Sequence, residues 1–285
     1  MSSAPEDRFR MSGVPLVTAG DLRVVLRTAD GVPVEALYEP CAAGPGDTAI
    51  VVAHGFTGSV DRPAVRRAAG VFARHAAVVT FSFRGHGRSG GRSTVGDKEV
   101  LDLAAAVEWA RGLGHRRVVT VGFSMGGSVV LRHAALYGAG GPKGRSAGGE
   151  RPDAHTDAVA SVSAPARWYY RGTAPMRRLH WVVTRPLGRL VGRFGLRTRI
   201  HTQDWDPVPL SPVDAVPLIA PTPLLIVHGD SDPYFPLDHP RMLAQAATGA
   251  AGPGAAELWV EAGMGHAENA AGDELLERVG EWLMR

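Results

Sequence analysis

Short apolar runs rich in strand-forming residues recur along the chain, and they constrain its fold more than any other feature. They are mainly apolar on successive positions and do not alternate with charged residues, which is typical of strands buried on both faces of a parallel sheet. Helical patterns lie between them, as in residues 97–114. Strand alternating with helix predicts a mostly parallel, doubly wound α/β sheet. The runs are LRVVL (22–26), TAIVVA (48–53), AAVVTFSF (76–83), RRVVTVG (116–122), AVASVSA (158–164), PLLIVHG (223–229) and ELWV (257–260).

Two segments interrupt this alternation. Residues 138–153 are glycine-rich and polar, which predicts a surface loop, and they lack the spacing of a phosphate-binding loop. Residues 166–215 separate two predicted strands. Because an α/β fold of 285 residues commonly forms one core with an insertion, we expect residues 1–165 and 216–285 to form the core and residues 166–215 to form a lid or cap.

Within this insertion, residues 185–197 place apolar and basic side chains on two faces of one predicted helix. The apolar face holds Leu187, Leu190, Val191 and Phe194, and the arginines that recur every four residues are Arg185, Arg189, Arg193 and Arg197. Two interpretations stay open: a solvated arginine face over an ordinary packed insertion, or recognition of an anionic substrate or lipid surface. The insertion also supplies aromatic residues suited to covering a pocket: Trp168, Tyr169, Tyr170, Trp181 and Trp205.

Charge and composition argue against several classes of protein. A net charge of +3 is too weak a field to indicate a nucleic-acid partner. The N-terminal residues 1–13 carry charges where a signal peptide needs an apolar core, and no run approaches the ~20 apolar residues of a membrane helix. The single cysteine, Cys41, cannot form an internal disulfide, which fits a reducing compartment. We therefore expect a cytoplasmic protein without a transmembrane segment.

The pentapeptide GFSMG, residues 122–126, matches G-x-S-x-G between a predicted strand and a predicted helix. Such a serine must project from a sharp turn toward a base, and Gly122 and Gly126 suit the crowded backbone of that turn. The structural alternative is that Ser124 caps the helix, since serine is a favoured N-cap residue. Groups at other strand ends distinguish the two interpretations.

A second strand end carries HGF, residues 54–56. Acyl transfer turns a carbonyl oxygen into an anion that needs N–H donors already in place, and the backbone N–H groups of Phe56 and Met125 are the natural pair. His54, directly before Gly55, suits a role in holding this loop by a hydrogen bond. The sequence therefore predicts an oxyanion hole beside Ser124.

Two further strand ends supply acids and a base. Asp230 and Asp232 follow the run at 223–229, and the glycine-flanked His266 follows the run at 257–260. Ligands bind at the carboxyl ends of strands in open α/β sheets, so these groups are expected to meet there. The order serine, acid, histidine along the chain matches one known hydrolase architecture.

Five ordered motifs, HGFTG, FRGHGRS, GFSMGG, HGDSDPYFP and GMGH, resemble those of the α/β-hydrolase superfamily from about residue 20 onward. The resemblance implies an α/β-hydrolase fold with Ser124 as nucleophile, His266 as base and Asp232 as orienting acid. The family pattern places the acid three residues after the glycine of HG, which leaves Asp230 as the competitor.

The sequence departs from several branches of this superfamily. Ser124 stands where dehalogenases and epoxide hydrolases have an aspartate, and Met125 stands where proline iminopeptidases tend to have a tryptophan. Phe123 stands where many esterases, thioesterases and lipases have a histidine. Close kinship with any one branch is therefore not implied.

These observations predict a cofactor-independent serine hydrolase that cleaves a carboxylic ester or thioester of a small-molecule acyl substrate. The alternatives are the same triad acting on an amide or carbon–carbon bond, and a non-catalytic ligand receptor. Metal ligation by His54, His86 and Asp232 is conceivable, but ligand spacing such as H-E-x-x-H is absent from the sequence. We therefore expect neither a metal nor an organic cofactor.

Overall fold

The computed structural model describes residues 21–44, 46–138, 141–142, 154–252 and 254–285. The predicted surface loop at 138–153 lies almost entirely outside the described residues, and the charged N-terminal stretch 1–13 lies wholly outside them.

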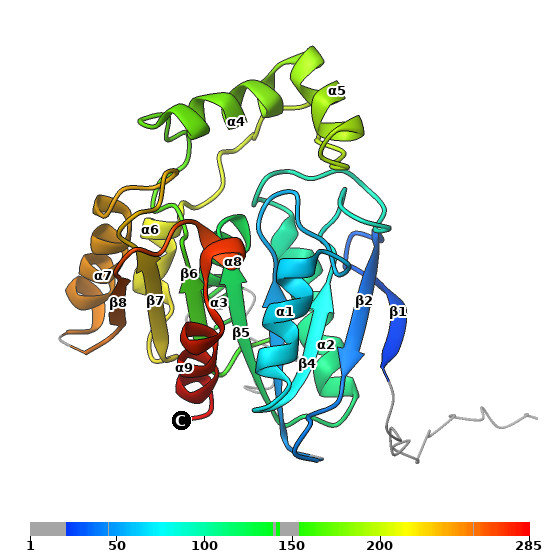
Figure 1. Ribbon diagram of the computed structural model, residues 1–285, viewed down its shortest axis with the longest axis vertical. Helices are drawn as coiled ribbons and strands as arrows, with labels where there is room; N and C mark the ends of the chain where they lie inside the picture. Colours follow the sequence, from blue (N-terminus) through cyan, green and yellow to red (C-terminus); the bar gives the residue numbers. More distant parts are fainter. Residues whose placement is uncertain (1–20, 45, 139–140, 143–153, 253) are drawn as a thin grey trace, which may run out of the picture.

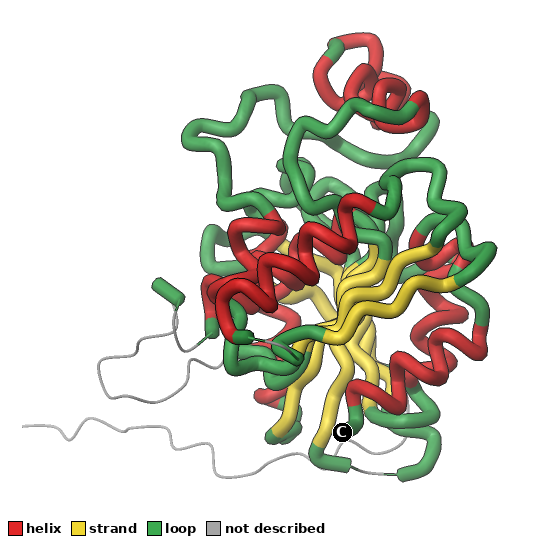
Figure 2. The backbone as a smooth tube through the Cα atoms, turned by 90° about the vertical axis from the view of Figure 1, so that its left-hand side faces the viewer, coloured by secondary structure: helices red, strands yellow, loops and turns green. Residues whose placement is uncertain are grey.

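Eight strands form one sheet in the order β1-β2-β4-β3-β5-β6-β7-β8, between two layers of helices (Figures 1 and 2). All neighbours from β4 to β8 pair in parallel, whereas β2 is antiparallel to both β1 and β4. The predicted mostly parallel α/β sheet is confirmed. The strands are β1 (Leu22–Arg27), β2 (Pro33–Glu39), β3 (Thr48–Ala53), β4 (Ala77–Phe81), β5 (Arg117–Phe123), β6 (Val159–Val162), β7 (Leu224–Gly229) and β8 (Glu257–Glu261).

Strand β2 was not among the predicted strands. Glu35 and Glu39 interrupt its apolar pattern, yet both side chains are largely buried. Arg23 forms an ion pair with Glu35, and Arg66 forms one with Glu39. A buried carboxylate is tolerated when it is paired, so two charged residues can lie within this sheet.

The helices bury the sheet on both faces. Successive residues of β3 alternate between the two cores: Val51 packs in the cluster formed with α2, α3 and α7, and Val52 packs in the cluster formed with α1 and α9. This double burial explains why successive residues of the strand runs are mainly apolar. The helices are α1 (Pro63–Phe72), α2 (Glu99–Gly112), α3 (Met125–Tyr137), α4 (Ala174–Thr184), α5 (Pro186–Phe194), α6 (Pro212–Ala215), α7 (Asp238–Ala251), α8 (Ala267–Ala270) and α9 (Asp273–Leu283), with a 3-10 turn at Val216–Leu218.

Helices α4 and α5, here called the α4–α5 segment, lie apart from the layered core, beyond the carboxyl ends of the strands (Figure 1). They belong to the connection from β6 to β7. Residues beyond α5 tie this connection to the core, because Ile200 forms a β-bridge with Ser93 and the Trp205 indole donates to the Thr94 carbonyl at 2.7 Å. None of the described helices is long and apolar enough to cross a membrane.

Helix α5 buries its glycines and exposes its large apolar side chains. Gly188 and Gly192 are buried, and a Cβ on Gly188 would lie 2.3 Å from the carbonyl oxygen of Trp181 in α4. Glycine therefore permits the close approach of the two helices. Contrary to the interpretation of an ordinary packed insertion, the apolar face points away from the core, with exposed fractions of 48–73% at Leu187, Leu190, Val191 and Phe194.

Candidate active site

Ser124 lies in a tight turn between β5 and α3. Its φ of 52° and ψ of −113° are values that residues with a side chain rarely adopt. A Cβ on Gly122 would lie 2.2 Å from the Gly126 carbonyl oxygen, and one on Gly126 would lie 2.2 Å from that of Ala53. The two glycines therefore allow the crowding that the turn requires. The Ser124 side chain makes no capping hydrogen bond, so the N-cap alternative does not describe it.

His266 bridges Ser124 and Asp232. Its Nε2 lies 2.8 Å from Ser124 Oγ, and its Nδ1 lies 2.7 Å from Asp232 Oδ2. Because an ionised carboxylate can only accept, Nδ1–H donates to Asp232 and Nε2 accepts from the Ser124 hydroxyl. Three loops, after β5, β7 and β8, thus bring Ser124 together at one edge of the sheet with two residues more than a hundred positions further along the chain.

The Asp232 carboxylate is fully buried and well supported. Its Oδ1 accepts from the backbone N–H groups of Tyr234 at 2.8 Å and Phe235 at 3.1 Å. Burial disfavours the charged form, but the hydrogen bond and charge of His266, together with these N–H groups, outweigh it. The pKa of Asp232 therefore lies below its usual value. The environment of Asp232 favours a carboxylate that stays ionised beside the imidazole.

Asp230, the competing acid, has other partners. Its side chain is exposed, and its Oδ1 accepts from the backbone N–H of Gly263 at 2.7 Å and the Ser231 hydroxyl at 3.0 Å. Among the described contacts, His266 has a hydrogen bond to Asp232 and none to Asp230.

The backbone N–H groups of Phe56 and Met125 donate no hydrogen bond to any residue that the structure describes. Met125 directly follows Ser124 at the start of α3, and both residues line the cavity that Ser124 faces. Met125 is at a helix N-terminus and Phe56 is in a turn, and an unpaired N–H group at either place is suited to an anionic oxygen.

His54 lies beneath the loop that carries Phe56. Its Nε2 accepts from the backbone N–H of Phe83 at 3.0 Å, so its Nδ1 carries the proton and donates to the Gly55 carbonyl at 2.7 Å. Burial lowers the pKa of His54 to about 3, so the ring is neutral at pH 7. The contact with the loop is the one expected for a residue that holds it in place.

Glu268, which the sequence analysis missed, links the loop of His266 to the loop of Phe56. It lies in α8, is 5% exposed, and accepts from the Gly55 N–H at 3.0 Å. Arg67 donates to the Glu268 backbone carbonyl at 2.8 Å. A Cβ on Gly55 would lie 3.1 Å from both carboxylate oxygens of Glu268. The only signal in the sequence was an acidic residue two positions after the histidine of GMGH, in an otherwise small and apolar stretch.

A cavity of about 630 Å³ lies beside Ser124 and between the core and the α4–α5 segment. The core contributes Phe56, Met125 and Phe235, and α4 contributes Met176, Leu179 and Val183. Of the aromatic residues that the sequence analysis singled out, four line this cavity: Trp168, Tyr169, Tyr170 and Trp205. Trp181 does not, and it is half-exposed on the other side of α4. The cavity is large enough for a small organic substrate.

The model of the Alpha/beta hydrolase family matches residues 50–278 of this chain. The chain belongs to the α/β-hydrolase family. No curated protein matches this α/β-hydrolase chain. Among solved structures, it is similar to the esterase Pf2001 of Pyrococcus furiosus, with a TM-score of 0.69 and 23% identity over 93% of this chain and 92% of that one.

Two other solved structures are similar over comparable lengths. The esterase domain of a Rhodothermus marinus protein has a TM-score of 0.60 and 20% identity over 93% of this chain and 96% of that one. A serine hydrolase without a lid from Xanthomonas campestris has a TM-score of 0.57 and 18% identity over 94% of both chains. At this level of identity the likeness shows the α/β-hydrolase fold.

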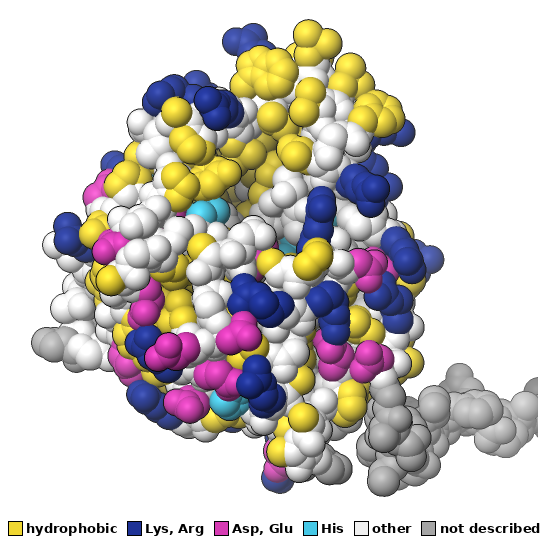
Figure 3. Space-filling model, in the orientation of Figure 1, with side chains coloured by type: hydrophobic (Ala, Val, Ile, Leu, Met, Phe, Trp, Pro, Cys, Tyr) yellow, Lys and Arg dark blue, Asp and Glu magenta, His cyan; other side chains and the backbone are white. Residues whose placement is uncertain are grey.

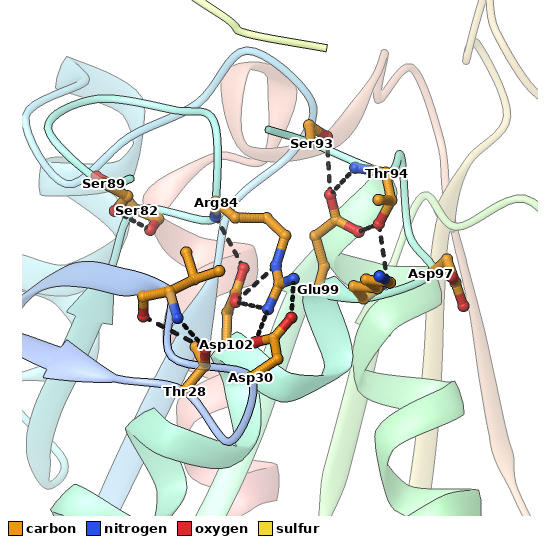
Figure 4. Close-up of polar contacts among 12 residues, drawn as sticks. Thr28, Asp30, Ser82, Arg84, Ser89, Ser93, Thr94, Asp97, Glu99 and Asp102 are labelled. Carbon is orange, nitrogen blue, oxygen red and sulfur yellow. Dashed lines mark hydrogen bonds and ion pairs between the residues drawn. The ribbon is translucent and has the colours of Figure 1, made fainter. Parts of the chain in front are cut away.

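In this α/β-hydrolase, the turn FRGHGRS after β4 rests on buried ionic contacts (Figure 4). Arg84 donates to Asp102 through Nε at 2.9 Å and through a guanidinium NH₂ at 2.7 Å. Further along the loop, the carboxylate of Glu99 accepts from the hydroxyls of Ser93 at 2.8 Å and Thr94 at 2.6 Å. Because Ser93 and Thr94 line the cavity, this network fixes one of its walls.

The described residues contain no cluster of three side chains suited to hold a metal ion. Of the three residues considered as metal ligands in the sequence analysis, His54 and Asp232 have the partners given above, and His86 Nδ1 lies 3.0 Å from the Arg84 carbonyl oxygen. Burial lowers the pKa of His86 to about 4.

Proposed function

We propose that the chain is a serine hydrolase that cleaves carboxylic esters through an acyl-enzyme. The observation that carries this proposal is the continuous hydrogen-bonded chain from Asp232 through His266 to Ser124 at the wall of a cavity. Ser124 is the nucleophile, His266 is the base, and Asp232 orients the imidazole.

In the proposed reaction, Ser124 Oγ attacks the acyl carbonyl carbon while its proton passes to His266 Nε2. The ionised Asp232 stabilises the imidazolium that forms. The backbone N–H groups of Phe56 and Met125 donate to the oxyanion, and removal of one such donor typically costs about 10²- to 10³-fold in rate. The imidazolium then protonates the departing alcohol. Water, deprotonated by His266, releases the acid and restores Ser124.

Two residues outside this set position the oxyanion donors. His54 holds the Gly55 carbonyl and Glu268 holds the Gly55 N–H, so the residue before Phe56 is fixed at both of its polar backbone atoms. A donor fixed in advance needs no reorganisation when charge develops, which is what makes an oxyanion hole effective.

The α4–α5 segment is the proposed lid, and its inner side gives the cavity an apolar wall suited to the acyl part of a small-molecule ester. The esterases among the similar structures support the choice of an ester over other bonds. The single cysteine supports a proposed cytoplasmic location.

Substrate panels test this proposal. Initial rates would be measured on matched p-nitrophenyl esters, thioesters and p-nitroanilides with acyl chains from acetyl to palmitoyl. We expect turnover of esters and its loss in Ser124→Ala. Ser128→Ala is the matched control, because Ser128 lines the same cavity from α3 and has no place in the hydrogen-bonded chain. Faster cleavage of anilides than of esters would overturn ester specificity.

A further inference from the structure

The outer side of the α4–α5 segment is an apolar surface with no partner in the described structure. We call it the outer apolar face; its residues, 47–73% exposed, are Trp181, Leu187, Leu190, Val191 and Phe194. Monomeric proteins rarely leave such large apolar side chains together in water unless they meet a partner. Helix α5 packs on α4 through its glycines. Its large apolar side chains therefore lie on the opposite side, away from the core.

The part of the chain that carries this face holds positive charge and no negative charge. Residues 171–203 hold eight of the chain's arginines and no aspartate or glutamate, although acidic residues outnumber basic ones in the rest of the chain. None of the eight forms an ion pair with a carboxylate among the described residues. Figure 3 shows the hydrophobic side chains gathered over α4 and α5, with Lys and Arg side chains around them. Three of the eight line the cavity, namely Arg171, Arg185 and Arg189, and five do not: Arg177, Arg178, Arg193, Arg197 and Arg199.

The positive charge of the arginines distinguishes between two possible partners for the outer apolar face, a second copy of the chain and a membrane. A second copy of the chain, docked through the same face, would bring two unpaired sets of arginines together, which is electrostatically unfavourable. An apolar face with a cationic border is typical of helices that lie in the interface of an anionic membrane. There the apolar side chains enter the boundary between headgroups and acyl chains, and guanidinium groups contact phosphates.

We propose that the outer apolar face docks on an anionic phospholipid surface. The same two helices line the cavity from their inner side, through Leu179 and Val183 of α4 and Arg189 of α5. A membrane-bound molecule would therefore hold the cavity wall at the lipid surface. Docking does not rest on the proposed hydrolysis, because none of the residues that carry it belongs to the hydrogen-bonded chain at Ser124.

The test measures co-sedimentation of the full chain carrying Ser124→Ala with vesicles of phosphatidylcholine, alone or with phosphatidylglycerol. We expect binding to the phosphatidylglycerol vesicles that is at least tenfold stronger than to phosphatidylcholine and that weakens as salt is raised. Leu187→Ser with Phe194→Ser should weaken binding at least tenfold. The matched control is Val25→Ser with Val260→Ser, which removes two exposed apolar side chains from the edge strands and should change nothing.

A charge-reversal variant tests the contribution of the arginines separately from that of the apolar side chains. Arg178→Glu with Arg193→Glu alters two arginines that do not line the cavity, and it should abolish the preference for phosphatidylglycerol. The same substitutions would also be made in the chain that keeps the wild-type Ser124. Circular dichroism and ester turnover of these variants would show that the fold and the site are intact. Equal binding to both vesicles, no binding, or equal loss in the control variant would overturn the proposal. A dimer that Leu187→Ser with Phe194→Ser converts to a monomer would assign the face to a second copy instead.

Discussion

At Ser124, the hydroxyl oxygen lies 2.8 Å from one nitrogen of the His266 imidazole, whose other nitrogen lies 2.7 Å from a buried carboxylate. The tautomer of His266 is set by Asp232, since only Nδ1–H can donate to a carboxylate. In the proposed mechanism, the reaction depends on which imidazole nitrogen of His266 carries the proton as well as on the distance to Ser124.

Asp232→Asn tests this dependence on the tautomer. The amide can donate to Nδ1, which leaves Nε2 protonated and unable to accept from Ser124. We expect kcat for a soluble p-nitrophenyl ester to fall by about 10⁴-fold, as it does when the same change is made in other serine hydrolase triads. Asp230→Asn is the control, and its kcat should stay within a few-fold of wild type. A larger loss in the Asp230 variant would reverse the assignment of the acid.

Glu268 gives a residue-scale prediction that distinguishes positioning from mere packing. Glu268→Ala removes the acceptor of the Gly55 N–H, so we expect kcat to fall by about 10- to 100-fold, less than for the loss of an oxyanion donor itself. The change in KM should be smaller. Glu268→Gln keeps an oxygen acceptor and should restore most of kcat. Equal losses in the Ala and Gln variants, or a loss confined to KM, would rule out the positioning role.

At the scale of the residue, the sequence pointed to Ser124, Asp232 and His266 because each follows a strand run within a recognisable motif. Glu268 could not be found in the same way. Its partner is a backbone N–H more than two hundred positions away, and backbone partners leave no trace in side-chain patterns.

At the scale of the element, α5 shows the limit of periodicity as evidence. The spacing of Leu187 and its apolar neighbours predicts an amphipathic helix, which is present, but it cannot say whether the apolar face meets the core or solvent. Here the glycine face packs inward. Strand β2 was missed for a different reason. It is buried, but it contains two glutamates paired with arginines, so a search for apolar runs does not detect it.

Gly188→Ala tests how α4 and α5 pack. The added methyl group would lie 2.3 Å from the Trp181 carbonyl oxygen, so the helices must separate, at a cost of about 1–3 kcal/mol. Hydrogen exchange of the amides in residues 174–194 should accelerate, while exchange in the sheet stays unchanged. Gly249→Ala in α7, where a Cβ meets nothing within 4 Å, is the control and should leave exchange equal or slower. Unchanged protection in Gly188→Ala would contradict the glycine-mediated contact.

At the scale of the whole molecule, the parallel sheet explains why residues distant in sequence meet. Strands β5, β6, β7 and β8 are neighbours in one sheet, so the loops that follow them open at the same edge. This relation was predictable from strand runs alone, since the carboxyl ends of parallel strands share an edge. The position of the α4–α5 segment was not, because no strand pairing determines it.

Buried neutral histidines predict how global stability depends on pH. Burial lowers the pKa of His54 to about 3 and that of His239 to about 4, from a usual 6.5. Below pH 6.5 the unfolded chain binds protons that the folded chain does not, so stability falls as pH falls toward those values. We expect the free energy of unfolding in urea to drop by roughly 2 kcal/mol per such histidine between pH 7 and pH 5.

A variant separates this effect from the titration of carboxylates. His239 accepts from the Ala166 N–H at 2.9 Å, and His239→Gln keeps an acceptor there but removes the titrating ring. Its unfolding free energy should fall less steeply between pH 7 and pH 5 than that of wild type. If the unfolding free energies of the two proteins depend on pH in the same way, the pKa of His239 is not lowered in the folded protein.

Active-site labelling shows whether Ser124 is an activated nucleophile, on which the proposed function depends. Wild type treated with a fluorophosphonate should gain the mass of one phosphonyl group, located at Ser124 by peptide mapping. Ser128→Ala should be labelled at the same rate, and Ser124→Ala should not be labelled. Equal labelling of Ser124→Ala and wild type, or an unlabelled wild type that is folded and inert toward esters, would contradict the account.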